Sequence, residues 1–388
     1  MHMHAQSPAG EAMKQLQDIL EGAVRKGRAP GFCAGVVDRS GDVHIAGAGV
    51  RGTDNPAPMT PDTVFMIASC TKALTGVAAM QLVERGLLDL DEPVGDRLPQ
   101  LKSPRVLAGF TADGEPITRP AKGSITLRRL LTHTSGFGYD FTSADLMRYL
   151  ARTGQTITGI AEPDVPLMFD PGESSLYGIG IDWTARLIEA ASGQTFDAYL
   201  AEHIFTPLGM KESSFFPNEA LGARKASVHQ KLADGSFAAA PFAWPPVRHF
   251  MMGGAGLYAT TSDYLKFLRA ILAHGAPLLK RETFCAMMTN QTGSLPVGTI
   301  KSSQPMLAND YEPLPRLKRG HGLAGLINLE PVPGGRSAGS LAWAGIANCY
   351  YWADPDAGIA GVLMAQVLPF ADAAIVETFN EVEHAAYV

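Results

Sequence analysis

The sequence predicts an α/β domain assembled from both ends of the chain, with a mainly helical segment between them. A helical pattern followed by strand patterns opens the chain, helical patterns fill the middle, and strand patterns return before a last helix. Strands and helices from both ends can then bury one shared core. We expect the α/β domain to comprise residues 1–79 and 245–388 and the helical domain residues 80–244, with the functional site between them.

The first elements follow from apolar spacing. Residues 11–27 carry apolar side chains every three or four positions, which predicts a helix. Residues 31–50 contain two apolar runs around a Ser-Gly turn and predict a β-hairpin. A helix is expected over residues 69–86, ended by a glycine. Residues 88–101 and the Gly/Pro-rich stretch 103–123 predict loops.

Helical patterns dominate the middle of the chain, and strand patterns return after it. Apolar residues at helical spacing occur in four segments: 125–133, 143–153, 180–193 and 195–205. Residues 205–252 are mixed, and 253–275 predict a short strand, a Thr/Ser cap and a helix. The last strand patterns and the terminal helix are expected in 321–331, 340–354, 357–368 and 371–387.

The composition argues against a nucleic-acid-binding protein, a membrane span and a C-x-x-C site. The chain has 388 residues, of which 46% are hydrophobic and 18% charged, and a formal charge of −6, so nothing favours a nucleic-acid partner. The longest nearly apolar stretch, 357–370, is shorter than the ~20 residues of a membrane span, and no signal peptide is evident, which favours a cytoplasmic location. Its four cysteines form no C-x-x-C pair and are expected to be small buried hydrophobes.

A serine and a lysine share one helical turn in "FMIASCTKALTGVAAM", residues 65–80. Ser69 and Lys72 lie three positions apart and face the same side of a helix. A lysine activates a serine only as the neutral amine, and both burial and a helix N-terminus disfavour the ammonium form. The free N–H groups of that terminus can also hold an oxyanion. In the alternative interpretation Ser69 caps the helix and Lys72 is a surface residue; the spacing alone does not decide.

Other candidate sites are weaker. Ser337 lies in a G-x-S-x-G pattern, but a Pro/Gly loop precedes it and a strand pattern follows, so we expect a loop residue. His133 is expected to be structural, and Cys70 to be buried packing. No histidines have metal-ligand spacing, and the glycines at 253–256 lack a following G-K-[ST]. No metal or cofactor is therefore expected.

Several ordered motifs besides S-C-T-K carry a family resemblance. They are "LLTHTSGFGY" (130–139), "PGESSLYGIGID" (171–182), "PLGMKESSF" (207–215) and "GGAGLYATTSDYLKFL" (253–268). With them the chain resembles the serine β-lactamase and DD-peptidase superfamily, specifically class C β-lactamases and family VIII carboxylesterases. The resemblance implies a β-lactamase-like fold, in which an antiparallel sheet flanked by helices accompanies a mainly helical domain.

The resemblance also assigns roles to residues. It implies Ser69 as nucleophile, with Lys72 and Tyr177 as bases. A phenol can serve as a base when a neighbouring ammonium favours its phenolate. The motif here continues with Gly178 and Ile179, whereas the family pattern is Tyr-x-Asn. A polar contact typical of β-lactam hydrolysis is therefore missing. Without the resemblance, Tyr177 would be interpreted as a core tyrosine.

The third family motif, Lys-Thr-Gly, corresponds here to Trp343-Ala344-Gly345. A neutral indole replaces a cation, which suits an apolar ester better than an anionic antibiotic. The resemblance implies substrate binding by Tyr139, Trp343 and Gly345, and an oxyanion hole made by the backbone N–H groups of Ser69 and Ile346. The alternative for Trp343 is a packed strand residue.

These observations predict a serine carboxylesterase that acts on small to medium acyl esters without a metal or cofactor. Its expected partner is a small-molecule ester, with no nucleic acid and no membrane span; the oligomeric state is left open. Three alternatives are a β-lactamase or D-amino-acid peptidase, an acyltransferase that uses the same acyl-enzyme, and a non-hydrolytic binding module.

Overall fold

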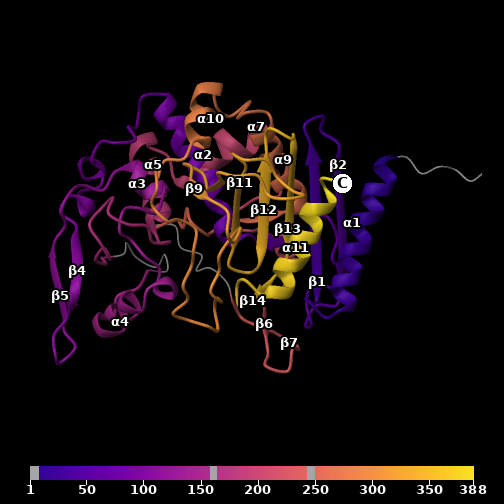
Figure 1. Cartoon of the computed structure of the whole chain (residues 1–388), viewed down its shortest axis with the longest axis horizontal. Coiled ribbons are helices and arrows are strands. Elements are labelled where there is room, and N and C mark those ends of the chain that lie inside the picture. The colour runs from indigo at the N-terminus through magenta and orange to yellow at the C-terminus, as the bar shows by residue number, and fades with distance from the viewer. Residues whose placement is uncertain (1–7, 158–163, 243–249) are drawn as a thin grey trace, which may run out of the picture.

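A seven-stranded antiparallel sheet forms the centre of the computed structural model, which describes residues 8–157, 164–242 and 250–388. Its strand order is β2-β1-β13-β12-β11-β10-β9. The amino-terminal hairpin β1–β2 therefore pairs directly with the carboxyl-terminal strands (Figure 1). The strands are β1 (Gly31–Asp38), β2 (Val43–Gly49), β9 (Arg319–His321), β10 (Leu326–Asn328), β11 (Leu341–Gly345), β12 (Cys349–Asp354) and β13 (Ile359–Met364). Both ends of the chain build one sheet, as the sequence predicts.

Helices cover both faces of this sheet. Successive residues of a strand point to opposite faces. Tyr350 stacks on Phe379 of α11 (Ala373–Ala385), whereas Tyr351 contacts Tyr264 of α9 (Thr261–Leu272). Helices α11 and α9 thus lie on opposite sides, and α1 (Pro8–Arg25) packs beside α11. An antiparallel sheet flanked by helices is the arrangement that the motifs imply.

Helix α2 (Thr71–Glu84) is buried along nearly its whole length. A one-turn 3₁₀ helix, Ala68–Cys70, precedes it, so the helix expected over 69–86 is confirmed. An all-round apolar helix belongs in a core. Helix α2 contacts α5 (Gly180–Ser192) on one side and α10 (Arg281–Met288) on another.

The remaining elements lie around this centre. The predicted helices of the middle segment are confirmed as α3 (Leu127–Leu131), α4 (Ala144–Thr153), α5 and α6 (Phe196–Leu200), the last continued by a π-helical turn, Ala201–Phe205. Short helices are α7 (Thr206–Leu208) and α8 (Glu219–Gly222). Strand β3 (Val64–Met66) pairs with β8 (Tyr258–Thr260), and β6 (His229–Lys231) lies between β7 (Phe237–Ala239) and β14 (Val367–Leu368). The proposed domain limits remain a prediction.

Two expectations were wrong. The stretch 103–123 was expected to be a loop but contains a hairpin, β4 (Arg105–Phe110) and β5 (Pro116–Pro120). Its prolines stand at the two ends of β5, where a strand tolerates them. Cys285, on α10, is exposed, whereas the other three cysteines are buried; all four are free. The Cys285 thiol is exposed because it lies on the solvent-facing side of this short amphipathic helix.

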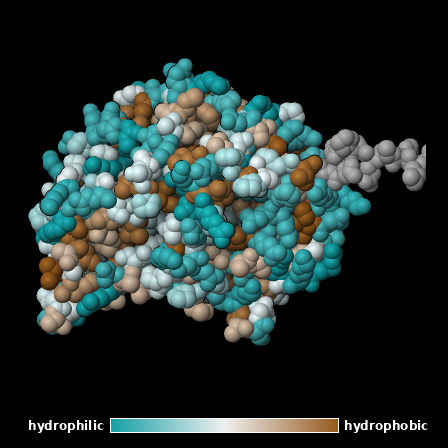
Figure 2. Space-filling view, viewed as in Figure 1, coloured by the Kyte–Doolittle hydropathy of each residue, from teal (hydrophilic) through white to brown (hydrophobic). Residues whose placement is uncertain are grey.

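The surface is mostly polar on the face seen in Figure 2, where apolar side chains form small separate patches. Across the described ranges, we find no helix with the length and apolar character of a membrane span.

Candidate active site

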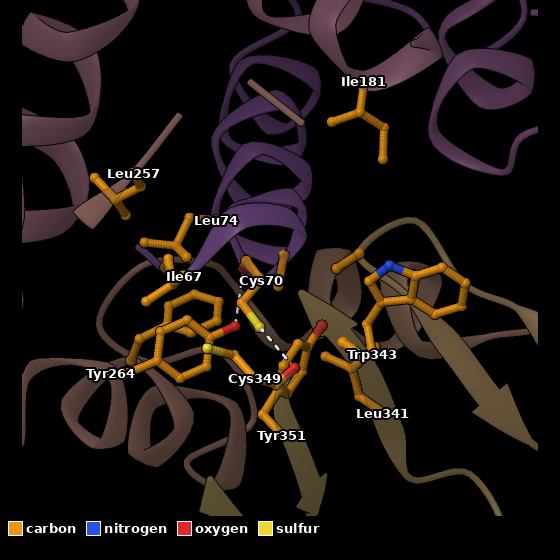
Figure 3. Packing of buried hydrophobic residues seen from close by; sticks show 14 of the residues in the cluster. Ile67, Cys70, Leu74, Ile181, Leu257, Tyr264, Leu341, Trp343, Cys349 and Tyr351 are labelled. Carbon is orange, nitrogen blue, oxygen red and sulfur yellow. Dashed lines mark hydrogen bonds between the residues drawn. The ribbon is translucent and has the colours of Figure 1, made fainter. Parts of the chain in front are cut away.

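Ser69 occupies the tight turn between β3 and α2. The residue before it, Ala68, is fully buried and has φ of +47°, a conformation that non-glycine residues rarely adopt. This turn brings the chain abruptly from strand to helix. Ser69 is 8% exposed at the start of α2. The side chain of the next residue, Cys70, points into the core, where Cys70 Sγ faces the carbonyl oxygen of Cys349 (Figure 3). The carbonyl oxygen of Cys70 accepts a hydrogen bond from Tyr264 OH. Cys70 is therefore a buried packing residue, as predicted.

The hydroxyl of Ser69 contacts both side chains that the motifs pair with it. Lys72 Nζ lies 3.0 Å from Ser69 Oγ, and Tyr177 OH lies 2.5 Å from the same oxygen. Lys72 is only 2% exposed. Tyr177 stands just before α5, so this contact joins residues that are distant in the chain. The structure thus brings the three predicted catalytic side chains together.

Lys72 is held by two further oxygens. Its Nζ lies 2.6 Å from the Gly254 carbonyl oxygen and 3.1 Å from Tyr139 OH. It also stands 4.7 Å from the centre of the Tyr177 ring. The Lys72 Nζ atom therefore lies next to both the hydroxyl of Ser69 and the ring of Tyr177.

Trp343 lies beside the same tyrosine. Its Nε1–H donates to Tyr177 OH at 3.3 Å, and the two ring centres are 5.1 Å apart. Figure 3 shows the side chain of Trp343, which extends from β11, with its nitrogen on the edge of the ring nearer to Ile181 of α5. The indole of Trp343 is therefore a packed residue of β11 that also contacts Tyr177, one of the predicted catalytic residues.

The turn after β11 carries the proposed second oxyanion donor. Ile346 begins the three-residue connection to β12, in which Asn348 has φ of +60°. The buried Asn348 amide donates to the carbonyls of Val367 at 2.8 Å and Pro369 at 2.9 Å, which fixes the turn. Ile346 and Ser69 line the same small cavity. This proximity supports the proposed pair of backbone N–H donors.

The cavity at Ser69 has apolar and aromatic walls. It measures about 20 Å³ and is lined by Ser69, Phe141, Tyr177, Ile300, Tyr311, Trp343, Ala344, Ile346 and Phe370. A larger cavity of about 560 Å³ shares Tyr311 and Trp343 with it. No lysine or arginine is among the residues lining the smaller one. The residues that line this cavity therefore bring no positive charge next to Ser69.

Tyr139 and Gly345 have surroundings different from those of the other predicted substrate-binding residues. The Tyr139 hydroxyl contacts Lys72 and donates to Asp182 Oδ2 at 3.2 Å, and its side chain is not part of the cavity wall at Ser69. Gly345 also lies outside that wall, directly against the backbone of Ile67. Their roles toward substrate stay predictions.

Asp182 was missed by sequence reasoning. This carboxylate is 2% exposed, and burial raises its pKa while the charge of Lys72 opposes the rise. Its Oδ1 accepts from the Gly254 N–H at 2.9 Å. Its position in the first helical turn is ordinary for an acid. The one unusual feature in the sequence is an acidic residue between two large apolar ones, Ile181 and Trp183.

His133 packs beneath the tyrosine rather than beside the serine. Its ring contacts Tyr177 with centres 4.8 Å apart, and its Nδ1 accepts from the Gly178 N–H at 3.4 Å. Burial lowers its pKa well below the usual value, and burial lowers the pKa of the neighbouring His321 to about 4. The His133 ring therefore packs against the tyrosine, and His321 in turn packs against His133 and Trp343, which agrees with a structural histidine at 133.

Ser337 lies in the loop between β10 and β11, as the flanking sequence predicts. Its backbone N–H donates to Asp354 Oδ2 at 2.7 Å. In residues 8–157, 164–242 and 250–388, no three His, Cys, Asp or Glu side chains converge as metal ligands.

The sequence pattern of the family described as Beta-lactamase matches residues 16–386. The chain belongs to that family. It is similar to monacolin J acid methylbutanoyltransferase of Aspergillus terreus, with 32% identity over 98% of this chain and 96% of that protein. Lovastatin esterase of Penicillium rubens is 31% identical over 91% of this chain and 93% of its own. Acyltransferases and an esterase are thus both among the relatives.

Solved structures agree with the fold. A variant of simvastatin synthase from Aspergillus terreus superposes with a TM-score of 0.85, with 32% identity over 98% of this chain and 95% of that one. EstCE1, a hydrolase with promiscuous acyltransferase activity, superposes with a TM-score of 0.78 over 98% of this chain and 100% of its own. At 20% identity the second likeness shows the fold alone.

Gly345→Ala tests the close approach of β11 to the nucleophile turn. A Cβ at this position would overlap the Ile67 carbonyl oxygen, a backbone atom that cannot turn aside. We expect the turn to shift, with a destabilisation of about 1–3 kcal/mol and a loss of turnover larger than that instability explains. Thermal unfolding and ester kinetics measure the two effects. Gly222→Ala, where a Cβ meets nothing within 4 Å, is the control. Equal behaviour of both variants would contradict the expectation.

Proposed function

We propose that this chain is a serine carboxylesterase that cleaves small to medium acyl esters through an acyl-enzyme on Ser69. The observation that carries the proposal is the contact of Ser69 Oγ with both Lys72 Nζ and Tyr177 OH inside a buried pocket. A nucleophile within hydrogen-bond distance of its bases is the arrangement that covalent catalysis requires.

The first step forms the acyl-enzyme. Ser69 Oγ attacks the ester carbonyl carbon while its proton passes to the Lys72 and Tyr177 pair. The backbone N–H groups of Ser69 and Ile346 receive the negative charge that develops on the carbonyl oxygen. Collapse of this intermediate breaks the bond to the alkoxy oxygen, and the departing alcohol takes the proton back from the pair.

The second step releases the acyl group. A water molecule enters where the alcohol left and gives a proton to the same pair as it attacks the acyl carbon. The tetrahedral species then collapses, the acid leaves, and Ser69 recovers its proton. Lys72 and Tyr177 therefore alternate between accepting and donating a proton.

Trp343 favours an ester over a β-lactam. Its indole stands where the family's cation would bind an anionic substrate, and its N–H is turned to Tyr177 OH. Ile179 occupies the position of the family's asparagine and is fully buried. The polar contacts expected for a β-lactam are therefore replaced by apolar groups.

A second candidate is acyl transfer to an alcohol, which the names of the acyltransferase relatives favour. It shares the acyl-enzyme and differs only in the acceptor of the second step. Incubating the enzyme with p-nitrophenyl butyrate and increasing butanol, and measuring butyl butyrate against butyric acid, separates the two. Butyrate alone supports hydrolysis, whereas a dominant butyl ester supports transfer.

We expect p-nitrophenyl butyrate to be preferred over nitrocefin by about 10- to 100-fold in kcat/KM. The lost charged contact to a substrate carboxylate corresponds to about 1.5–3 kcal/mol. Steady-state rates for both substrates measure the ratio. A preference for nitrocefin would support the β-lactamase alternative instead, and one equivalent of bound acyl without turnover would support a non-hydrolytic module.

A further inference from the structure

Asp182 is a buried carboxylate that has no part in the proton transfers described above. Its two oxygens accept hydrogen bonds from Tyr139 OH at 3.2 Å and from the Gly254 N–H at 2.9 Å. The same two residues supply the oxygens that hold Lys72. Asp182 therefore binds both groups that fix the amine on the sides away from Ser69.

These groups form one closely packed cluster. A Cβ built on Gly254 would stand 2.9 Å from Tyr139 OH, 3.0 Å from Asp182 Oδ2 and 3.0 Å from Lys72 Nζ. Only glycine leaves room for all three polar atoms at this point. The cluster draws its members from α2, the loop before α4, α5 and the loop before β8, so the tertiary structure alone assembles it.

We propose that Asp182 is a positioning residue that orients the hydrogen bonds around Lys72 so that the lone pair of the neutral amine faces Ser69. The inference rests on the proposed function. A neutral amine has two N–H donors and one lone pair. An ionised carboxylate only accepts, so Tyr139 donates its O–H to Asp182 and offers its oxygen to Lys72.

The carbonyl of Gly254 likewise only accepts. Two acceptors therefore take both N–H groups of the neutral amine, and the lone pair is left for the third neighbour, the hydroxyl of Ser69. After the amine takes up the serine proton, its three N–H groups match the same three oxygens. The proton can pass without any of these groups turning, which is the advantage of a preorganised site.

The charge of Asp182 acts on the same amine. The titratable groups around Lys72 are the hydroxyls of Tyr139 and Tyr177, the buried imidazoles of His133 and His321, the thiol of Cys70, and Asp182. Asp182 supplies the negative charge among them, and the charge of Lys72 opposes the rise of the Asp182 pKa that burial causes.

Asp182→Asn tests the orientation. The variant amide oxygen can still accept from the Gly254 N–H, but its NH₂ then faces Tyr139 and donates to the phenol oxygen. Tyr139 must turn its O–H toward Lys72, where it competes for the lone pair. We expect kcat for p-nitrophenyl butyrate to fall by about 10- to 100-fold with little change in KM.

Tyr139→Phe removes the link between Asp182 and Lys72 and should also lower kcat. If Asp182 orients the amine through Tyr139, the double variant loses less than the product of the two single losses. If the two losses of kcat instead multiply in the double variant, Asp182 does not act on the amine through Tyr139. Should Asp182→Asn fail to fold, Tyr139→Phe with unchanged kcat would overturn the inference by itself.

Asp263→Asn is the matched control. Asp263 is an equally buried carboxylate in the first turn of α9, where it accepts from the Glu212 N–H and pairs with Lys266. We expect this variant to lose stability while its kcat stays close to that of wild type. A wild-type chain without ester turnover or Ser69 labelling would contradict the proposed function itself. An active wild type with an unaltered Asp182→Asn would contradict this inference alone.

Discussion

Ser69→Ala is expected to reduce ester turnover by at least about 10⁴-fold and to abolish covalent labelling by a fluorophosphonate. The substitution removes the one oxygen that contacts both Lys72 and Tyr177. Neither partner can replace it as a nucleophile, because both are held in place to exchange its proton. Release of p-nitrophenol measures turnover, and the intact mass of the protein measures labelling.

The control for this variant is Ser337→Ala, the serine of the competing G-x-S-x-G pattern. Ser337 lies in the loop before β11, and its backbone rather than its hydroxyl makes the contact with Asp354. Turnover and labelling should both stay within about twofold of wild type, as for surface substitutions with small energetic effects. If Ser337→Ala were inactive and Ser69→Ala active, the site assignment would be wrong.

Tyr177→Phe is expected to lower kcat by about 10²- to 10⁴-fold, the range of a single general acid–base group. Phenylalanine keeps the ring against His133 and Trp343 but lacks the hydroxyl that lies 2.5 Å from Ser69 Oγ. The fold should therefore survive, with a melting temperature near that of wild type. Because the lost group acts in the transition state, KM should change far less than kcat.

Tyr199→Phe is the matched control for the loss of a buried phenol hydroxyl. Tyr199 is fully buried on α6, and its hydroxyl has no hydrogen-bond partner within the part of the chain that the structure describes. Removing it should leave kcat unchanged and stability equal or higher, since no bond is lost. A Tyr177→Phe variant that kept wild-type kcat would exclude the phenol as a base.

Local sequence patterns predicted most of the elements, because their physical causes are local. The helices from residue 125 to 205 follow from apolar spacing, and helix α9 follows from a Thr cap with an acid in its first turn. The β4–β5 hairpin was missed because its glycines and prolines are the residues of loops and of strand ends alike. Only pairing between the two strands distinguishes these cases.

The residues of the candidate site likewise fall into those that a local pattern predicts and those that it does not. Ser69 and Lys72 were predicted because one helical turn fixes their separation, whatever surrounds the helix. Tyr177 and Trp343 needed the family resemblance, since no spacing relates residues so far apart. Asp182 escaped because its local pattern, an acid in the first turn of a helix, has an ordinary explanation. Its burial and its contact with Tyr139 depend on another segment folding over it.

The sequence by itself thus determined that a serine and a lysine face each other across a turn, and that strands from both ends flank a helical middle. Only the tertiary structure decided which phenol meets the serine and which acid stands behind the lysine. The physical reason is that a helical repeat places neighbours within a few ångströms through backbone geometry alone. Contacts between distant segments instead depend on how the whole core packs.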